Sequence, residues 1–207
     1  MKSFKTIEQM NRNEIVIEKS RFITSIFHID SVDDANNYLE KTRKEFYNAT
    51  HNCFAYVIGE NYSIQKFSDD GEPQGTAGIP ILETIKQKGI TNVLVIVTRY
   101  FGGIKLGAGG LTRAYVSSAS ECINTATVKT YEVSSKITLA SDYSIYQVIN
   151  RFLMSRKIKV LDTRFNETIE VDLVVKEDEA EKLIGEIINL TNNKVNITNK
   201  EEMMYSF

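Results

Sequence analysis

The stretch Val93–Tyr115, VLVIVTRYFGGIKLGAGGLTRAY, runs from an apolar segment through a cluster of glycines into a segment with helical spacing. Val93 to Val97 is an unbroken apolar run, mostly Val and Ile, which is typical of a strand covered on both faces. Glycine lets a backbone turn tightly or approach a ligand closely. We therefore predict a strand, a glycine-rich turn and a helix over about Leu111–Thr125, and we expect function to lie at the turn.

The residues before this stretch alternate between strand and helix patterns. Ser31 and Asp34 form a variant of the capping box and predict a helix through about Tyr47. Pro80 and Gly89 stand where proline and glycine favour the start and the end of a second helix. Strands are predicted at Ile15–Ile17, Arg21–Ile29, Cys53–Ile58 and Ser63–Phe67, the last two as a hairpin around Gly59–Asn61.

A second unit is predicted from residue 132 onward, so the expected domains are 1–131 and 132–207. Its elements follow the order βαββαβ, which is that of a ferredoxin-like split unit. Asp178 and Glu181 have capping-box spacing before its second helix. Strands are predicted at Lys136–Leu139, Ile158–Asp162, Thr168–Val175 and Lys194–Thr198, and helices at Tyr143–Met154 and up to about Leu190. The fold class expected from these patterns is α+β.

Composition sets broad limits on function. The chain has 207 residues, 42% hydrophobic and 25% charged, with a formal net charge of −2. That balance argues against general attraction to nucleic acid or acidic membranes, so such binding needs a local basic patch. No secretory signal and no apolar run of the ~20 residues that a membrane span needs is recognised. Cys53 and Cys122 form neither a disulfide framework nor a zinc motif, and we expect a cytoplasmic protein without membrane contact.

The glycine-rich turn carries the cations Arg99, Lys105 and Arg113 and no acid. Its spacing fits neither a P-loop nor a dinucleotide fingerprint. Two interpretations remain open, a purely structural turn and an anion site in which backbone N–H groups act with the cations. Phosphate is the anion that suits arginine best. The residues expected in this site are Arg99, Tyr100, Phe101, Gly102, Gly103, Lys105, Gly107, Gly109, Gly110 and Arg113.

A second turn-rich segment, SDDGEPQGTAGIP at Ser68–Pro80, contains Asp69, Asp70 and Glu72. These acids, with His51, could act as acid, base or metal ligands, but Asp-Gly and Glu-Pro pairs also make ordinary turns. The residues supply no complete catalytic set, and no metal site or cofactor is assigned. Because both turns lead into helices, they could line one cleft.

Tyr100 and Phe101 stand beside Arg99, where an aromatic pair could stack on nucleic-acid bases. Aromatic residues at a strand end also pack commonly into a core or its rim. Both interpretations remain open from the residues alone.

Four stretches of the chain resemble the YigZ and IMPACT family. They are SRFI from Ser20, HNCFAY from His51, DDGEP with GTAG between Asp69 and Gly78, and the long motif RYFGG…LG.GGL.RAY from Arg99 to Tyr115. The resemblance implies an N-terminal α+β domain like the second domain of a small-subunit ribosomal protein. It also implies a C-terminal ferredoxin-like domain similar to those of elongation factor G.

The resemblance implies a connection with translation, and with RNA or the ribosome as partner. Eukaryotic IMPACT restrains an initiation-factor kinase largely through an additional N-terminal RWD domain. We do not expect that domain in this chain, so the kinase role is not carried over. We expect an RNA- or ribosome-associated regulatory binding protein, with Arg99, Lys105 and Arg113 on phosphates. The alternatives are an enzyme that acts on a small phosphorylated or peptide-like substrate, and a protein–protein adaptor.

Overall fold

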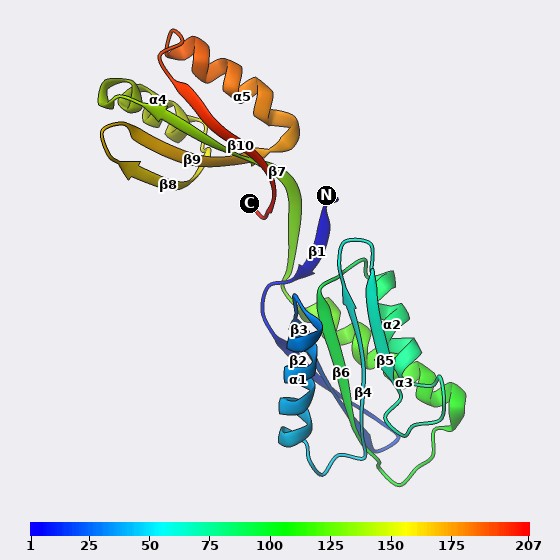
Figure 1. Ribbon diagram of the computed structural model, residues 1–207. Coiled ribbons are helices and arrows are strands. Elements are labelled where there is room, and N and C mark those ends of the chain that lie inside the picture. The colour runs from blue at the N-terminus through cyan, green and yellow to red at the C-terminus, as the bar shows by residue number, and fades with distance from the viewer. The chain divides into compact units, whose positions relative to one another are not determined.

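The computed structural model describes all residues from Met1 to Phe207 and contains five helices and ten strands. The chain divides into two compact units, Phe4–Thr130 and Tyr131–Phe207, the latter joined by Met1–Ser3. Each unit has an antiparallel sheet and a hydrophobic core of its own (Figure 1). The expected α+β class is therefore confirmed.

The first unit is built on one sheet with the strand order β2-β3-β6-β4-β5. A short strand, β1 at Phe4–Ile7, adds Ile7 to its core and bridges to Ile90 through Lys5. The sheet strands are β2 (Asn11–Ile17), β3 (Ser20–His28), β4 (His51–Ile58), β5 (Ile64–Ser68) and β6 (Val93–Tyr100). β1 is the strand that the sequence pattern did not predict.

Strand β6 is the centre of this sheet, as its unbroken apolar run predicted. Val93, Val95 and Val97 pack into one core with helices α2 (Gly78–Gln87) and α3 (Gly107–Thr125). Leu94 and Ile96 point to the opposite face, into a second core with α1 (Val32–Glu45). Alternate side chains of a strand face opposite ways, so only a strand covered on both faces can be apolar at every position.

Local signals placed the first two helices well. Ser31 and Asp34 form the full capping box at the start of α1, with the Asp34 amide donating to Ser31 Oγ at 3.1 Å. Pro80 lies in the first turn of α2, and Gly89, with φ of +64°, follows its end. The hairpin between β4 and β5 turns at Gly59, whose carbonyl accepts from the Tyr62 amide at 3.0 Å.

The second sheet has five strands in the path β1-β7-β9-β8, and β10 also pairs with β7. Within the C-terminal unit the order is therefore β10-β7-β9-β8, with β7 between β9 and β10. This strand order and the βαββαβ chain order define a ferredoxin-like unit. Its core joins the sheet to α4 (Tyr143–Ser155) and α5 (Glu177–Leu190). The strands are β7 (Val128–Ser141), β8 (Lys159–Phe165), β9 (Ile169–Lys176) and β10 (Asn196–Tyr205).

Two expected helix starts are wrong. Helix α5 begins at Glu177, directly after β9, with no side-chain cap, so Asp178 and Glu181 form no capping box. Ser135 instead donates a hydrogen bond to Glu177, which holds the helix start against β7. Helix α3 begins at Gly107 and not near Leu111, since glycine weakens helix propensity without forbidding a helix.

Candidate functional site at the glycine-rich turn

The turn between β6 and α3 occupies residues 101–106, and glycine is required there for close backbone contact. A Cβ on Gly102 would lie 2.0 Å from the Lys19 carbonyl carbon, so no larger residue fits without movement. The Gly102 amide donates to Ser20 Oγ at 3.2 Å. Gly103, with φ of +86°, has open space around it. The turn is thus hydrogen-bonded to the start of β3 at Gly102 and is open to solvent or a ligand at Gly103.

Helix α3 begins with exposed, uncapped backbone. Its N-cap residue, Leu106, makes no side-chain hydrogen bond, and the first turn contains no acid. Gly107, Gly109 and Gly110 of the expected site lie within this first turn. The first N–H groups of a helix have no partner inside the helix and favour anions. The backbone contribution to the expected site is therefore the start of α3.

Arg99 is placed differently from the free cation that the sequence suggested. It is 5% exposed, and its Nη1 atom donates to Glu72 Oε1 at 2.6 Å while Nη2 donates to Ser20 Oγ at 3.3 Å. Its guanidinium lies 5.4 Å from the centre of the Phe22 ring and 5.6 Å from that of Phe101. Its Nε is buried and has no hydrogen-bond partner. Arg99 therefore joins the two turns through a buried ion pair.

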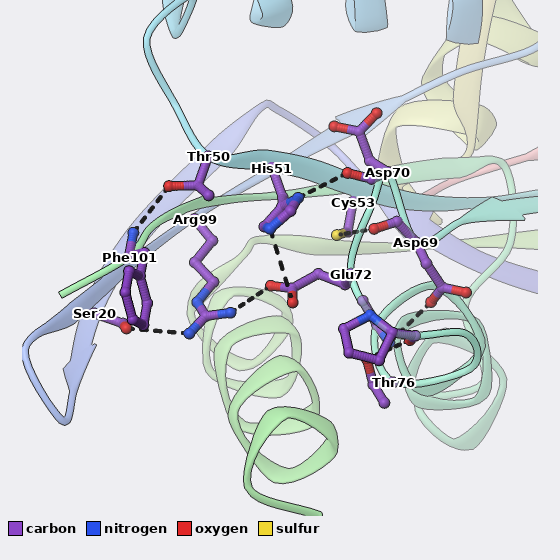
Figure 2. Close-up of polar contacts among 12 residues, drawn as sticks. Ser20, Thr50, His51, Cys53, Asp69, Asp70, Glu72, Thr76, Arg99 and Phe101 are labelled. Carbon is purple, nitrogen blue, oxygen red and sulfur yellow. Dashed lines mark hydrogen bonds and ion pairs between the residues drawn. The ribbon is translucent and has the colours of Figure 1, made fainter. Parts of the chain in front are cut away.

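Glu72 is the centre of a buried polar cluster, which Figure 2 shows. Besides the Arg99 ion pair, its Oε1 accepts a hydrogen bond from the Tyr115 hydroxyl at 2.8 Å. His51 Nε2 lies 3.9 Å from Glu72 Oε2, while His51 Nδ1 is 2.8 Å from the Asp70 carbonyl oxygen. A carbonyl only accepts, so Nδ1 carries a proton and donates to Asp70.

The two aspartates of the acidic turn hold backbone rather than face a ligand. Asp69 accepts from the amides of Gly75, Ala77 and Gly78 at 2.8 to 3.0 Å, and so orders the loop that enters α2. Asp70 accepts from the Asn52 amide at 2.6 Å and from Arg43 at 3.3 Å. These bonds occupy the carboxylates, as Asx turns commonly do. No group of three or more His, Cys, Asp or Glu side chains is arranged to hold a metal ion.

The Cys53 thiol lies beside the same cluster and is buried. It donates to the Asp69 carbonyl at 2.9 Å and lies 3.3 Å from the Tyr115 hydroxyl. Burial raises the pKa of Cys53 to about 12, and it also raises the pKa of Tyr115. Because the thiolate is the nucleophilic form, Cys53 stays an unreactive thiol near neutral pH. The spacing of His51 and Cys53 thus serves packing and hydrogen bonding.

The aromatic pair after Arg99 divides between two roles. The Tyr100 hydroxyl donates to Asn48 at 2.9 Å, and its ring is covered by Arg21, with 5.4 Å between guanidinium and ring centre. Phe101 is 46% exposed, and its backbone amide is held by Thr50 at 3.0 Å. Phe101 therefore presents the freer ring of the two.

One cavity joins the acidic turn to the glycine-rich turn. It has a volume of about 340 Å³ and is lined by Glu72, Pro73, Arg99, Phe101, Lys105, Leu106, Gly107, Ala108 and Leu111. The two turns thus line a common cleft, as the sequence suggested. A second hollow of about 410 Å³ contains Lys105 and Arg113, with Glu18 at its wall. Lys105 lines both and, like Arg113, is exposed and makes no ion pair.

Sequence reasoning missed two members of the cluster, Ser20 and Tyr115. Ser20 Oγ accepts from both Arg99 and the Gly102 amide, and the Tyr115 hydroxyl donates to Glu72 and contacts the Cys53 thiol. Both residues stand in stretches that carry the family resemblance, which was the available signal. Their roles depend on contacts across the sheet, which no local pattern contains.

Two known protein families match parts of this chain. Residues 18–123 match the family described as "Impact N-terminal domain", and residues 139–194 match a "Domain of unknown function (DUF1949)". The first match contains every residue of the cluster around Glu72. The chain belongs to the IMPACT family.

Relatives in this family differ in how much of the chain they share. "IMPACT family member YvyE" of Bacillus subtilis is 41% identical over 96% of this chain and 92% of its own length. "IMPACT family member YigZ" of Escherichia coli is 40% identical over 61% of this chain and 63% of its own. "Protein IMPACT" of Danio rerio is 34% identical over 45% of this chain and 30% of its own. The two bacterial relatives therefore match a longer part of this chain than the Danio rerio protein does.

A solved structure described as "Crystal structure of an hypothetical protein" has a similar fold. It is 28% identical, with a TM-score of 0.63, over 95% of this chain and 97% of that one. In this IMPACT family member, no helix combines the length and the apolar character needed to cross a membrane.

Proposed function

We propose that this protein is an RNA- or ribosome-associated binding protein that takes part in the regulation of translation. Membership of the IMPACT family fits a regulatory protein connected with translation. The observation that carries the RNA contact is the cavity of about 340 Å³ at the start of α3. It combines an uncapped helix start, the Lys105 ammonium and the exposed Phe101 ring.

Phosphate contacts are assigned to Lys105 and Arg113. Both are exposed and free of acidic partners, so their charge is available to an anion. The open backbone at Gly107 and Gly109 lets a phosphate reach the helix N–H groups. Arg99 is not assigned a phosphate contact, because its charge is already neutralised by Glu72. Arg99 instead lines the cavity and packs against the ring of Phe101, which would stack on a base.

An enzymatic role is not favoured by the same contacts. Asp69 and Asp70 are engaged with backbone amides, and Glu72 is paired with Arg99. A general acid or base must reach the proton that it transfers. None of these three carboxylates is left without a partner.

The test is fluorescence anisotropy with labelled tRNA and a single-stranded oligoribonucleotide at low and near-physiological salt. We expect Lys105→Ala/Arg113→Ala to weaken binding and to reduce the slope of log affinity against log salt by about 2, roughly 1 for each lost phosphate contact. Lys5→Ala/Lys66→Ala removes two exposed lysines of the same unit elsewhere and should change little.

Wild-type affinity in the Lys105→Ala/Arg113→Ala variant, with the fold intact by circular dichroism, would overturn the site assignment. Absence of RNA binding by the wild type would overturn the RNA proposal itself. A partner recovered equally well after ribonuclease treatment would favour the protein–protein adaptor.

A further inference from the structure

The segment from Tyr143 to Phe165, which forms α4, the following turn and β8, is strongly basic in an otherwise slightly acidic chain. We refer to it as the α4–β8 edge. Its one acid is Asp162, and its cations are Arg151, Arg156, Lys157, Lys159 and Arg164. The neighbouring helix α5 has the opposite balance, with a single lysine among its acids.

Three of these cations are available to a ligand. Lys157 and Lys159 are exposed and form no ion pair, and the Arg151 guanidinium donates only to the Gln147 carbonyl of its own helix at 3.2 Å. The other two are engaged, Arg156 with Glu186 at 3.0 Å and Arg164 with Asp172 at 2.9 Å. Unpaired cations on one edge produce a local positive potential, although the net charge of the whole chain is negative.

Exposed aromatic rings occupy the same edge. Tyr143 is 64% exposed and Phe165 is 63% exposed. Tyr146 lies between them, with its ring centre 6.5 Å from that of Tyr143 and 5.6 Å from that of Phe165. Large apolar surface is costly in water, so rings held this far out on a small unit indicate a binding surface.

The fold sets the rings and the lysines at opposite ends of the edge. Tyr143 is the first residue of α4 and Phe165 the last of β8, whereas Lys157 and Lys159 lie where α4 passes into β8. A helix of this length, 13 residues, spans roughly 20 Å. β8 is also the edge strand of its sheet (Figure 1). The edge is thus an extended track and not a closed pocket.

The sheet face away from the helices offers no comparable surface. Two of its cations are held in ion pairs, Lys136 with Asp172 and Glu201, and Arg164 with Asp172 and Glu170. Lys159, which pairs with Val174 of β9, is the unpaired cation at the β8 edge of this face. The Arg164 guanidinium holds the pKa of Asp172 at about 2, so this network stays charged over the neutral range. Free cations and exposed rings are combined at the α4–β8 edge.

We propose that the α4–β8 edge binds single-stranded RNA. Arg151, Lys157 and Lys159 would contact phosphates, and Tyr143 and Phe165 would stack on bases. Single-strand binders combine cations along the backbone with aromatic platforms in this way. An acidic protein or an anionic membrane would use the same cations and cover the rings without stacking, so vesicles are compared with RNA in the test. This site lies on the C-terminal unit and does not depend on the cavity at α3.

The test uses the full chain, a labelled short oligouridylate, the same sequence in a duplex, and vesicles containing phosphatidylserine. We expect the single strand to bind in preference to the duplex and the vesicles. Lys157→Ala/Lys159→Ala should weaken single-strand binding and lower its salt dependence. Tyr143→Leu/Phe165→Leu keeps the apolar bulk but removes the rings, and should weaken binding about tenfold or more.

Two matched controls separate this site from the one at α3. Lys176→Ala/Lys200→Ala removes two exposed lysines of the same unit, which pair with Glu132 and Glu181 outside the edge, and should leave affinity unchanged. Lys105→Ala/Arg113→Ala tests the glycine-rich turn alone. If RNA binding is lost only in the latter variant, the edge proposal is overturned while the proposed function stands.

Loss in the edge variants alone would support the edge and overturn the assignment at α3. Equal binding of vesicles and RNA, or indifference to the ring substitutions, would overturn single-stranded RNA as the ligand. Retained α/β circular dichroism in every variant guards against loss of folding as the cause.

Discussion

Glu72 stands in a segment whose acids were considered as acid, base or metal ligands or as ordinary turn residues, and the fold makes it the centre of a buried cluster. Its carboxylate is paired with Arg99 and bonded by Tyr115, residues that are distant in the chain. Burying a charge is costly unless a partner compensates it. The Arg99–Glu72 ion pair therefore adds little net stability, but removal of either charge is costly because the other is left buried without a partner.

Replacement of Glu72 by Gln should show this requirement. The side chains of Arg99 and Glu72 are 6% and 3% exposed, so Glu72→Gln leaves a buried guanidinium without its counter-charge. We expect a loss of about 3 kcal/mol in the free energy of unfolding, measured by urea denaturation.

The exposed pair of Arg21 and Glu14, with side chains 52% and 42% exposed, is the matched control. Glu14→Gln should cost less than about 1 kcal/mol, because water screens that pair. Similar small losses for both variants would contradict the structural role given to Glu72.

At the scale of elements, the passage from β6 to α3 combines two uses of glycine. Gly102 is needed for contact between backbones, whereas Gly109 lies inside a helix and its added Cβ would meet only the end of the Arg113 side chain at 3.6 Å. At Gly102, glycine is thus required because a side chain would clash with neighbouring backbone. At Gly109, glycine leaves the start of α3 accessible, as the proposed anion site requires.

Alanine at these two glycines should have opposite effects on stability. Gly102→Ala places a Cβ against Lys19 backbone, and we expect it to lower the free energy of unfolding by about 2 kcal/mol or more. Gly109→Ala should raise it by up to about 1 kcal/mol, because alanine favours a helix more than glycine does. Thermal and urea unfolding of both variants measure this, and a loss in Gly109→Ala would show that its backbone is strained.

At the scale of the whole molecule, the chain holds two units with separate hydrophobic cores. Ile81 is fully buried in the core between the first sheet and its helices α2 and α3. Leu173 is fully buried in the core of the C-terminal unit. Separate cores allow separate stabilities, so each unit can open without the other.

Core truncation should therefore act within one unit. Leu173→Ala and Ile81→Ala each create a cavity that we expect to cost about 2 to 5 kcal/mol in the unit concerned. Native-state hydrogen exchange should show lost protection in the sheet of β7 to β10 for the first variant and in that of β2 to β6 for the second. Equal loss of protection in both units from either substitution would mean that they unfold as one.

Patterns local to the chain determined most of the elements. The apolar run at Val93–Val97 identified the central strand, and Ser31 with Asp34 identified the start of α1, because a strand's two faces and a helix cap are read within a few residues. The βαββαβ order likewise determined the ferredoxin-like unit. The starts of α3 and α5 were predicted wrongly, because α3 already begins at Gly107 in spite of its glycines and α5 begins directly after β9, where Ser135 bonds Glu177.

The tertiary structure alone decided how the polar residues are used. From the sequence, Arg99 was expected to contact an anion and Glu72 to be a candidate acid, base or metal ligand. The pairing of β3, β4 and β6 instead brings the two into an ion pair. Lys105 and Arg113 stayed free for the same reason, because no acid was brought to them. The sequence determines which side chains are charged, but the ion-pair partner of each one depends on segments that come together only on folding.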